Sequence, residues 1–251
     1  MQDYIKRLKD GCPKRRFVFW WIFRALMIYA FVAGFFKKPF DITDPLQVFA
    51  NFLCMFVWEV FMMFPEKSTF RHVPSSVQSF LIVGVFAASF GGKFMNFYYD
   101  LRWWDSALHL IGGAACVFAG YELACALMKR EKTAASVTMV LFAAVGFSFI
   151  GSTLWELFEF SFDQVAGMMS GYPGDAQHWS LELALNTPKE LTLFNPVVPE
   201  RWPIMDTMGD MVLNTVGAAL AYVFLKFVPY RHKGKYKFDF NFESGKAASD
   251  V

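Results

Sequence analysis

The chain has 251 residues, a formal net charge of +2 and a mean hydropathy of +0.32. Hydrophobic residues make up 55% of it and charged residues only 18%, a balance that excludes an ordinary soluble globular domain. The composition therefore predicts a membrane protein. The length fits one compact bundle, so we expect a single membrane domain over residues 1–251.

Six segments are long and apolar enough to cross a membrane as helices of about 20 residues. They cover residues 17–36, 45–64, 76–95, 105–127, 136–160 and 207–229. The first segment is too long for a cleavable signal peptide and lacks a small-residue cleavage site, so we expect it to remain as an anchor. The predicted fold class is all-α, a polytopic integral membrane bundle of six transmembrane helices over residues 17–229.

Lysine and arginine counts in the connecting segments predict the orientation. Sixteen of these residues lie in the two tails and in the second and fourth connections, and six lie in the alternate connections. Because positive residues favour the cytoplasmic side, both termini are expected in the cytoplasm of a multi-pass cell-membrane protein. The basic tail over 1–16 and the tail over 230–251 would then lie on that side.

Several familiar site classes are not indicated. The four cysteines form no CxxC motif, and three lie in apolar segments, so they predict neither disulfides nor a cysteine metal site. No phosphate-binding glycine loop or nucleotide fingerprint occurs, so no nucleotide cofactor is expected. The basic tail lacks the interleaved aromatic residues of a nucleic-acid site. Its expected partners are membrane lipids, including the anionic inner leaflet.

Three groups of polar side chains interrupt the apolar segments at helical spacing. In chain order they are Asp105 and His109, then Glu156 and Glu159, then Asp206, Asp210 and Asn214. An aspartate at the bilayer centre costs roughly 2.5 to 3.5 kcal/mol, so such residues seldom persist without a partner, a water-filled cavity or a bound cation. Each group lies on one helix face, and the predicted orientation places all three in the outer half of the membrane. We expect them to line one cavity that opens outward.

Simpler explanations exist for some of these residues taken singly. Asp105 and Asp206 lie where an aspartate commonly caps a helix N-terminus. His109 fits a hydrogen-bonded core histidine, and Asn214 fits a hydrogen bond between helices. The three remaining acids lie inside apolar runs, where capping does not explain them.

Electrostatics then predicts a cation. Two carboxylates 4 Å apart repel by about 4 kcal/mol at an effective dielectric of about 20, so the cluster must be partly protonated or hold a cation. One imidazole with several oxygens suits Mg²⁺, Mn²⁺ or Ca²⁺, or Zn²⁺ with an open coordination position. The candidate ligands are His109, Glu156, Glu159, Asp206, Asp210 and Asn214, and the candidate catalytic residues are His109, Asp105 and Glu159.

Two further features concern the rest of the chain. The connection over 164–204 is far longer than usual and lies on the outer side, where it is either an ordered cover for the site or a plain external loop. Arg24 and Glu59, in the first and second segments, are expected to pair with each other or to extend their charged ends towards the membrane surface.

The stretches YYDLRWWDSALHLIGG, WELFE and DTMGDMVLNTVGA, within residues 98–220, resemble the YjdF-like family of uncharacterised bacterial inner-membrane proteins. More distantly, the chain is similar to the VanZ-like family. That family's pattern has an acid four residues before a His, a Glu-bearing helix and Asp-x-x-x-Asn-x-x-Gly. In this sequence the pattern corresponds to Asp105 and His109, Glu156 or Glu159, and Asp210, Asn214 and Gly217. The VanZ-like resemblance implies a cell-envelope role.

Three kinds of function follow as hypotheses. The first is a metal-dependent membrane enzyme that acts on a lipid or lipid-linked cell-envelope substrate at the outer leaflet. The second is a small cation- or proton-coupled transporter whose acids bind the coupling ion. The third is a non-catalytic membrane partner protein. The first is preferred, because the inner halves of the last three segments carry almost no charge except Glu122.

Overall fold

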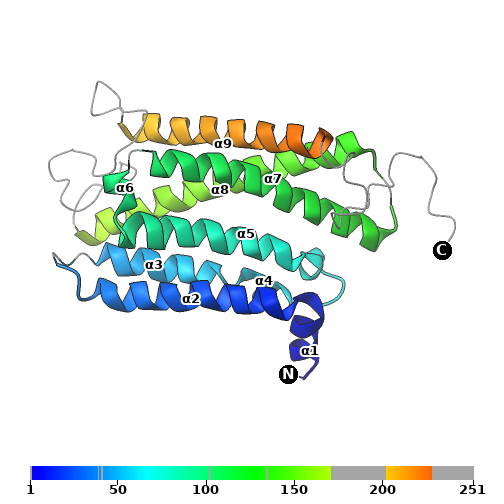
Figure 1. The fold of residues 1–251 in the computed structure, drawn as a ribbon, viewed down its shortest axis with the longest axis horizontal. Helices are drawn as coiled ribbons and strands as arrows, with labels where there is room; N and C mark the ends of the chain where they lie inside the picture. The colour runs from blue at the N-terminus through cyan, green and yellow to red at the C-terminus, as the bar shows by residue number, and fades with distance from the viewer. Residues whose placement is uncertain are drawn as a thin grey trace.

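The structure, a computed structural model, describes residues 2–38, 40, 42–101, 103–133, 135–170 and 202–227. In this part of the chain all regular structure is helical, and most helices lie side by side along the longest axis (Figure 1). The elements are α1 (Gln2–Gly11), α2 (Lys14–Gly34), α3 (Thr43–Cys54), α4 (Val57–Phe61), η1 (Thr69–His72), α5 (Ser75–Phe86), η2 (Ala87–Phe94), α6 (Phe97–Asp100), α7 (Trp104–Glu131), α8 (Val137–Ser170) and α9 (Trp202–Phe227). The predicted all-α membrane bundle is therefore confirmed.

Five of the described helices are long and apolar enough to cross a membrane. They cover Lys14–Gly34, Ser75–Phe94, Trp104–Glu131, Val137–Ser161 and Thr207–Phe227. These correspond to the first, third, fourth, fifth and sixth predicted segments. The third contains a π-helical stretch, η2, in its second half, where the sequence is richest in small residues.

The predicted second span, 45–64, is broken into α3 and α4 rather than forming one continuous helix. The break lies at Met55 and Phe56, and side chains from neighbouring helices satisfy the backbone groups that it frees. The Met55 carbonyl accepts hydrogen bonds from Arg24 and from Gln78, and the Trp58 N–H donates to the Gln78 side-chain oxygen at 2.9 Å. Irregular backbone inside a membrane bundle requires such partners.

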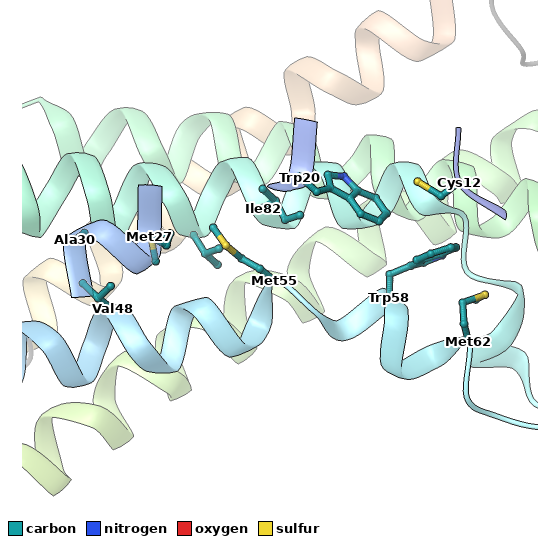
Figure 2. Packing of buried hydrophobic residues seen from close by; sticks show 10 residues of the cluster. Cys12, Trp20, Met27, Ala30, Val48, Met55, Trp58, Met62 and Ile82 are labelled. Carbon is teal, nitrogen blue, oxygen red and sulfur yellow. The ribbon is translucent and has the colours of Figure 1, made fainter. Parts of the chain in front are cut away.

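The first half of the bundle packs around the break. Figure 2 shows Met55 at the end of α3 near Met27 and Ile82, with Trp58 beside Trp20. The two indole rings meet edge to face, with 5.5 Å between their centroids. Aromatic pairs of this geometry add about 0.5 to 1.5 kcal/mol beyond the area that they bury. This N-terminal half-bundle consists of α2, α3, α4, α5 and η2.

The second half of the bundle is built from α7, α8 and α9, which pack closely on one another. Its core combines small and large apolar residues from the three helices, among them Val117, Tyr121, Leu141, Ala144 and Ala218. We call these three helices the C-terminal half-bundle. Contacts between α5 and α7 join it to the N-terminal half-bundle (Figure 1).

The two ends of the bundle differ. α1 projects away from the bundle at one end, and α9 finishes towards the same end (Figure 1). The opposite end contains the start of α7, the end of α8 and the start of α9. The predicted loop over 164–204 is helical where α8 continues to Ser170 and where α9 begins at Trp202. Its remaining residues and the predicted tail over 230–251 lie outside the described residues.

Candidate functional site

The polar residues of α7, α8 and α9 come together inside the C-terminal half-bundle. Asp105 and His109 lie in the first two turns of α7, and Glu156 and Glu159 lie near the C-terminal end of the apolar part of α8. Asp210 and Asn214 lie in the first turns of the apolar part of α9. All six side chains are buried, and we call them the His109 cluster: Asp105, His109, Glu156, Glu159, Asp210 and Asn214.

A close crossing of α7 and α9 explains why these residues meet. A Cβ atom added to Gly113 would overlap the backbone of Asn214, and one added to Gly217 would overlap the backbone carbonyl of Leu110. Glycine at both positions lets the two backbones touch. Because His109 is one helical turn from Gly113 on α7, this contact places Asn214 directly against the imidazole.

His109 lies at the centre of the cluster. Its Nε2 atom is 3.4 Å from a carboxylate oxygen of Asp105 and 3.5 Å from one of Asp210. Its Nδ1 atom is 3.1 Å from the amide nitrogen of Asn214 and 3.7 Å from a carboxylate oxygen of Glu156. Of these four distances, only the one to Asn214 lies in the usual hydrogen-bond range.

Two overlapping groups in the cluster have ligand atoms close enough to bind a metal ion. Asp105, His109 and Asp210 form one group, and His109, Glu156 and Glu159 form the other, with ligand atoms within 4.8 Å of one another in each. Asp206 lies in the first turns of α9, but its side chain is outside the described part of the chain. Asp105 lies in the first turn of α7, and no side chain caps that helix.

Within the described residues, the cluster contains four acids and one imidazole. Four ionised carboxylates around one protonated imidazole would leave three net negative charges in a buried site. Carboxylates about 4 Å apart repel by about 4 kcal/mol per pair at an effective dielectric of about 20, so protons or cations must offset part of this charge. Two divalent ions, or one divalent ion with two protons, would neutralise four carboxylates beside a neutral His109.

A second polar centre lies in the N-terminal half-bundle. The Arg24 guanidinium donates to a Glu59 carboxylate oxygen at 2.6 Å, and both residues are buried. The guanidinium also lies 4.0 Å from the centre of the Phe56 ring, a favourable cation–π distance. The sequence suggested the Arg24–Glu59 pair, but it gave no signal for Gln78, which completes this centre at the break between α3 and α4.

Comparison with known proteins identifies the family. The family described as "Predicted membrane protein (DUF2238)" matches residues 19–231 of this chain. The chain belongs to this family. The YjdF-like family named from the sequence motifs is the same one, so that resemblance is confirmed. The match covers both half-bundles and the whole His109 cluster.

One curated relative extends the comparison without adding an activity. A Thermotoga maritima protein named "Uncharacterized protein" is 29% identical to this chain over 100 residues. The aligned region covers 40% of this chain and 50% of that protein, so the chain spans only half the length of this relative. No solved structure matches the chain.

Proposed function

We propose that the protein is a divalent-metal-dependent membrane enzyme that acts on a lipid or lipid-linked cell-envelope substrate. The observation that carries this proposal is the His109 cluster, a buried imidazole with four carboxylates at one end of an apolar bundle. A set of buried acids with one imidazole matches the hard ligands that divalent ions prefer. Such a concentration of ionisable groups in a membrane bundle is a functional-site hypothesis by default.

The depth of the cluster supports a lipid substrate. His109 is five residues from the start of α7, or about 8 Å along the helix at 1.5 Å per residue. Asp210 is three residues from Thr207, where the apolar part of α9 begins. The cluster therefore lies within about two helical turns of the end opposite to α1 (Figure 1). A lipid head group reaches this depth without crossing the membrane.

Each residue of the cluster has a proposed role in the reaction. A bound divalent ion would polarise a phosphoryl or acyl oxygen of the substrate. Asp105 lies one turn before His109 on the same helix face, so both side chains are placed to hold the ion. Glu159 accepts the proton of the attacking water. The proposed reaction class is hydrolysis or group transfer at an ester of the envelope lipid.

Metal content and lipid composition test this function. The purified protein is expected to contain Mg²⁺, Mn²⁺ or Zn²⁺, or to gain thermal stability when one of them is added. A deletion strain is expected to accumulate an envelope lipid that wild-type protein removes and that His109→Ala does not. His72→Ala is the matched control, because His72 lies on η1, outside the His109 cluster, where its ring nitrogen lies 2.9 Å from the Glu66 carbonyl.

Two results would contradict the enzyme. If wild-type protein contains no divalent ion and gains no stability from any of the three, the proposed metal dependence is wrong. If the deletion strain has unchanged lipids, or if His109→Ala restores them as well as wild type does, the proposed catalytic role of the cluster is wrong. The cluster would then be reinterpreted as the structural centre of a non-catalytic membrane partner protein.

A cation- or proton-coupled transporter is the second candidate function. The observation that favours it is the Arg24–Glu59 pair at a break between two short helices, since many transporters bind ions at broken helices. Purified protein in vesicles would then carry protons or Na⁺ across the bilayer, and Glu59→Gln would abolish this flux. If the protein is instead the proposed enzyme, these vesicles should show no flux above that of empty liposomes.

We further propose that α3 and α4 together form the sixth crossing and that both termini are cytoplasmic. Residues 43–61 run alongside the continuous helix α2 (Figure 1). The excess of positive residues in the tails supports the orientation. The VanZ-like likeness is also proposed to be real, because Asp105, His109, Asp210, Asn214 and Gly217 all lie at or beside one site.

Single introduced cysteines test this topology. In a background without native cysteines, residues 9, 66 and 240 are expected to react only when a reagent reaches the cytoplasm. Phe36, exposed beyond the other end of α2, is expected to react in intact cells after substitution by Cys. If positions 36 and 66 react from the same side, α3 and α4 do not cross the membrane. If a cysteine at position 9 or 240 reacts with an impermeant reagent applied to intact cells, the proposed orientation is wrong.

A further inference from the structure

The two ring nitrogens of His109 have different surroundings. Nδ1 lies 3.1 Å from the side-chain amide of Asn214, which is a hydrogen-bond distance. Nε2 instead lies between two carboxylates from different helices, Asp105 of α7 and Asp210 of α9. One nitrogen is therefore held by an amide, and the other points at two acids.

The distances at Nε2 match those between two ligands of one metal ion. A tetrahedral ion with bonds of 2.0 to 2.1 Å separates its ligand atoms by about 3.4 Å, and an octahedral ion with similar bonds by about 3.0 Å. The Nε2 atom lies 3.4 Å from Asp105 and 3.5 Å from Asp210. Both values exceed a normal hydrogen bond and agree with the edge of a tetrahedron.

We propose that His109 Nε2, Asp105 and Asp210 bind one tetrahedral divalent ion of the zinc type, and that Asn214 is a positioning residue. This inference rests on the proposed metal-dependent function and names the ligands and the class of ion. Three protein ligands leave a fourth position for water or substrate, the pattern of catalytic zinc sites. It also assigns the site to α7 and α9.

Asn214 would act through the orientation of the imidazole. The two ends of its amide are interchangeable by a half-turn, so the amide oxygen can accept a hydrogen bond from Nδ1–H at the same distance. That bond places the proton on Nδ1 and leaves the Nε2 lone pair for the ion. Partners of this kind fix the ring of a metal-binding histidine, and their loss typically weakens metal affinity by about 10- to 100-fold.

The backbone contact between α7 and α9 holds this arrangement. Gly113 and Gly217 leave no room for a side chain between the helices, so the distance between His109 and Asn214 is fixed by touching backbones. Asp105 lies one turn from His109 on the same face of α7. All three ligands and the positioning residue therefore belong to one rigid helix pair.

Glu156 and Glu159 of α8 fall outside this coordination shell. The nearest Glu156 oxygen is 3.7 Å from Nδ1, the nitrogen that Asn214 already occupies. Within the proposed enzyme, Glu156 and Glu159 do not bind this ion and are the candidate bases for the attacking water.

Metal titrations of purified full-length variants test the assignment. Zn²⁺ affinity is measured by competition with a coloured chelator, and geometry by the visible spectrum of bound Co²⁺, which is intense for tetrahedral and weak for octahedral sites. Asp105→Asn and Asp210→Asn are expected to weaken Zn²⁺ binding by more than roughly 100-fold, and Asn214→Leu by about 10- to 100-fold. Asn214→Asp, which keeps an oxygen acceptor for Nδ1–H, should restore binding to within a few-fold of wild type.

The matched controls are Glu156→Gln, Glu159→Gln and the exposed Glu131→Gln, and none should change Zn²⁺ affinity by more than a few-fold. This inference is overturned if Glu156→Gln and Glu159→Gln strongly weaken Zn²⁺ binding while Asp105→Asn or Asp210→Asn weakens it little. That result would place the ion on the Nδ1 side of His109. A weak Co²⁺ spectrum would overturn the tetrahedral geometry. Both results leave the proposed function standing, whereas wild-type protein that binds no divalent ion contradicts the proposed function itself. Asn214→Leu that lowers metal-free stability but not Zn²⁺ affinity would make Asn214 purely structural.

Discussion

The two half-bundles handle buried charge in opposite ways. In the N-terminal half-bundle, one cation meets one carboxylate, and Arg24 and Gln78 also satisfy the backbone at the break between α3 and α4. In the C-terminal half-bundle, four acids gather around one imidazole, and the carboxylate oxygens of Asp105, Asp210 and Glu156 lie 3.4 to 3.7 Å from its nitrogens. Among the residues that the structure describes, the first centre pairs one positive with one negative charge, whereas the second gathers four acids around one imidazole.

This contrast separates a structural role from a binding role. A neutral, hydrogen-bonded pair stabilises a particular helix geometry and requires nothing from outside the protein. A cluster with excess negative charge is stable only with protons or a bound cation. We therefore expect substitutions in the N-terminal half-bundle to change stability alone. Substitutions in the C-terminal half-bundle should change stability in a way that depends on metal.

The largest effect is expected from Arg24→Met. It leaves Glu59 buried without its cation and removes one of two donors to the Met55 carbonyl. Removing one partner of a buried ion pair typically destabilises a protein by about 3 to 5 kcal/mol. Denaturation of the purified variant in detergent measures the change, which should be the same with and without divalent ions.

A double substitution sharpens that result. Arg24→Met with Glu59→Gln removes both charges and should recover part of the lost stability, which gives the coupling between the two residues. Lys37→Met is the control, because Lys37 pairs with Asp44 at 3.1 Å in a partly exposed site and should contribute only about 0 to 1 kcal/mol. Equal losses for Arg24→Met and Lys37→Met would show that the buried pair does not hold the break.

The second largest effect is expected from Gly217→Ala. The added methyl group would overlap the Leu110 carbonyl and force α7 and α9 apart. Overpacking of this kind costs about 1 to 3 kcal/mol, and the separation of Asn214 from His109 should also weaken metal binding. Gly146→Ala on α8 is the matched control, since nothing lies within 4 Å of its added methyl group. If both variants melt and bind metal alike, the close crossing does not position the site.

Removing one negative charge from the His109 cluster should raise the stability of the metal-free protein, in contrast to the two substitutions above. Glu159→Gln lowers the repulsion among the buried carboxylates, so the metal-free protein should become more stable by on the order of 1 kcal/mol. Thermal denaturation after chelation measures this change. The exposed Glu131→Gln on α7 should leave the midpoint unchanged. Loss of stability in metal-free Glu159→Gln would show that the cluster does not carry excess negative charge.

The sequence predicted the helices of the C-terminal half-bundle better than those of the N-terminal half. Continuous apolar periodicity marks α7, α8 and α9, and their polar residues recur at three- and four-residue spacing. The break between α3 and α4 has no such local signal, because the side chains that stabilise it lie far away in the chain. Arg24 is 31 residues from Met55, and Gln78 is 23 residues from it.

The candidate site was predictable in membership but not in geometry. Common depth and common helix faces grouped seven residues, and the structure brings six of them together, with the Asp206 side chain outside the described residues. Periodicity does not reveal which acids face which nitrogen of His109. That division depends on the contact of Gly113 and Gly217 with the opposite backbones, which only the packed helices show.

The smallest effect is expected where α1 attaches to the N-terminal half-bundle. The Tyr4 hydroxyl donates to the Glu59 backbone carbonyl at 3.1 Å, so Tyr4→Phe should lower the free energy of unfolding by about 0.5 to 1 kcal/mol.

Burial, with a smaller contribution from the Glu59 carboxylate, raises the pKa of Tyr4 above its ordinary value of 10.0. The unfolded chain therefore loses this proton at lower pH than the folded protein, and stability falls as pH rises above about 10. Tyr4→Phe should remove that part of the decline in a denaturation series across pH 8 to 11, whereas Tyr29→Phe, whose ring is largely exposed, should retain it. An identical pH dependence in wild type and Tyr4→Phe would show that the hydroxyl does not couple α1 to α4.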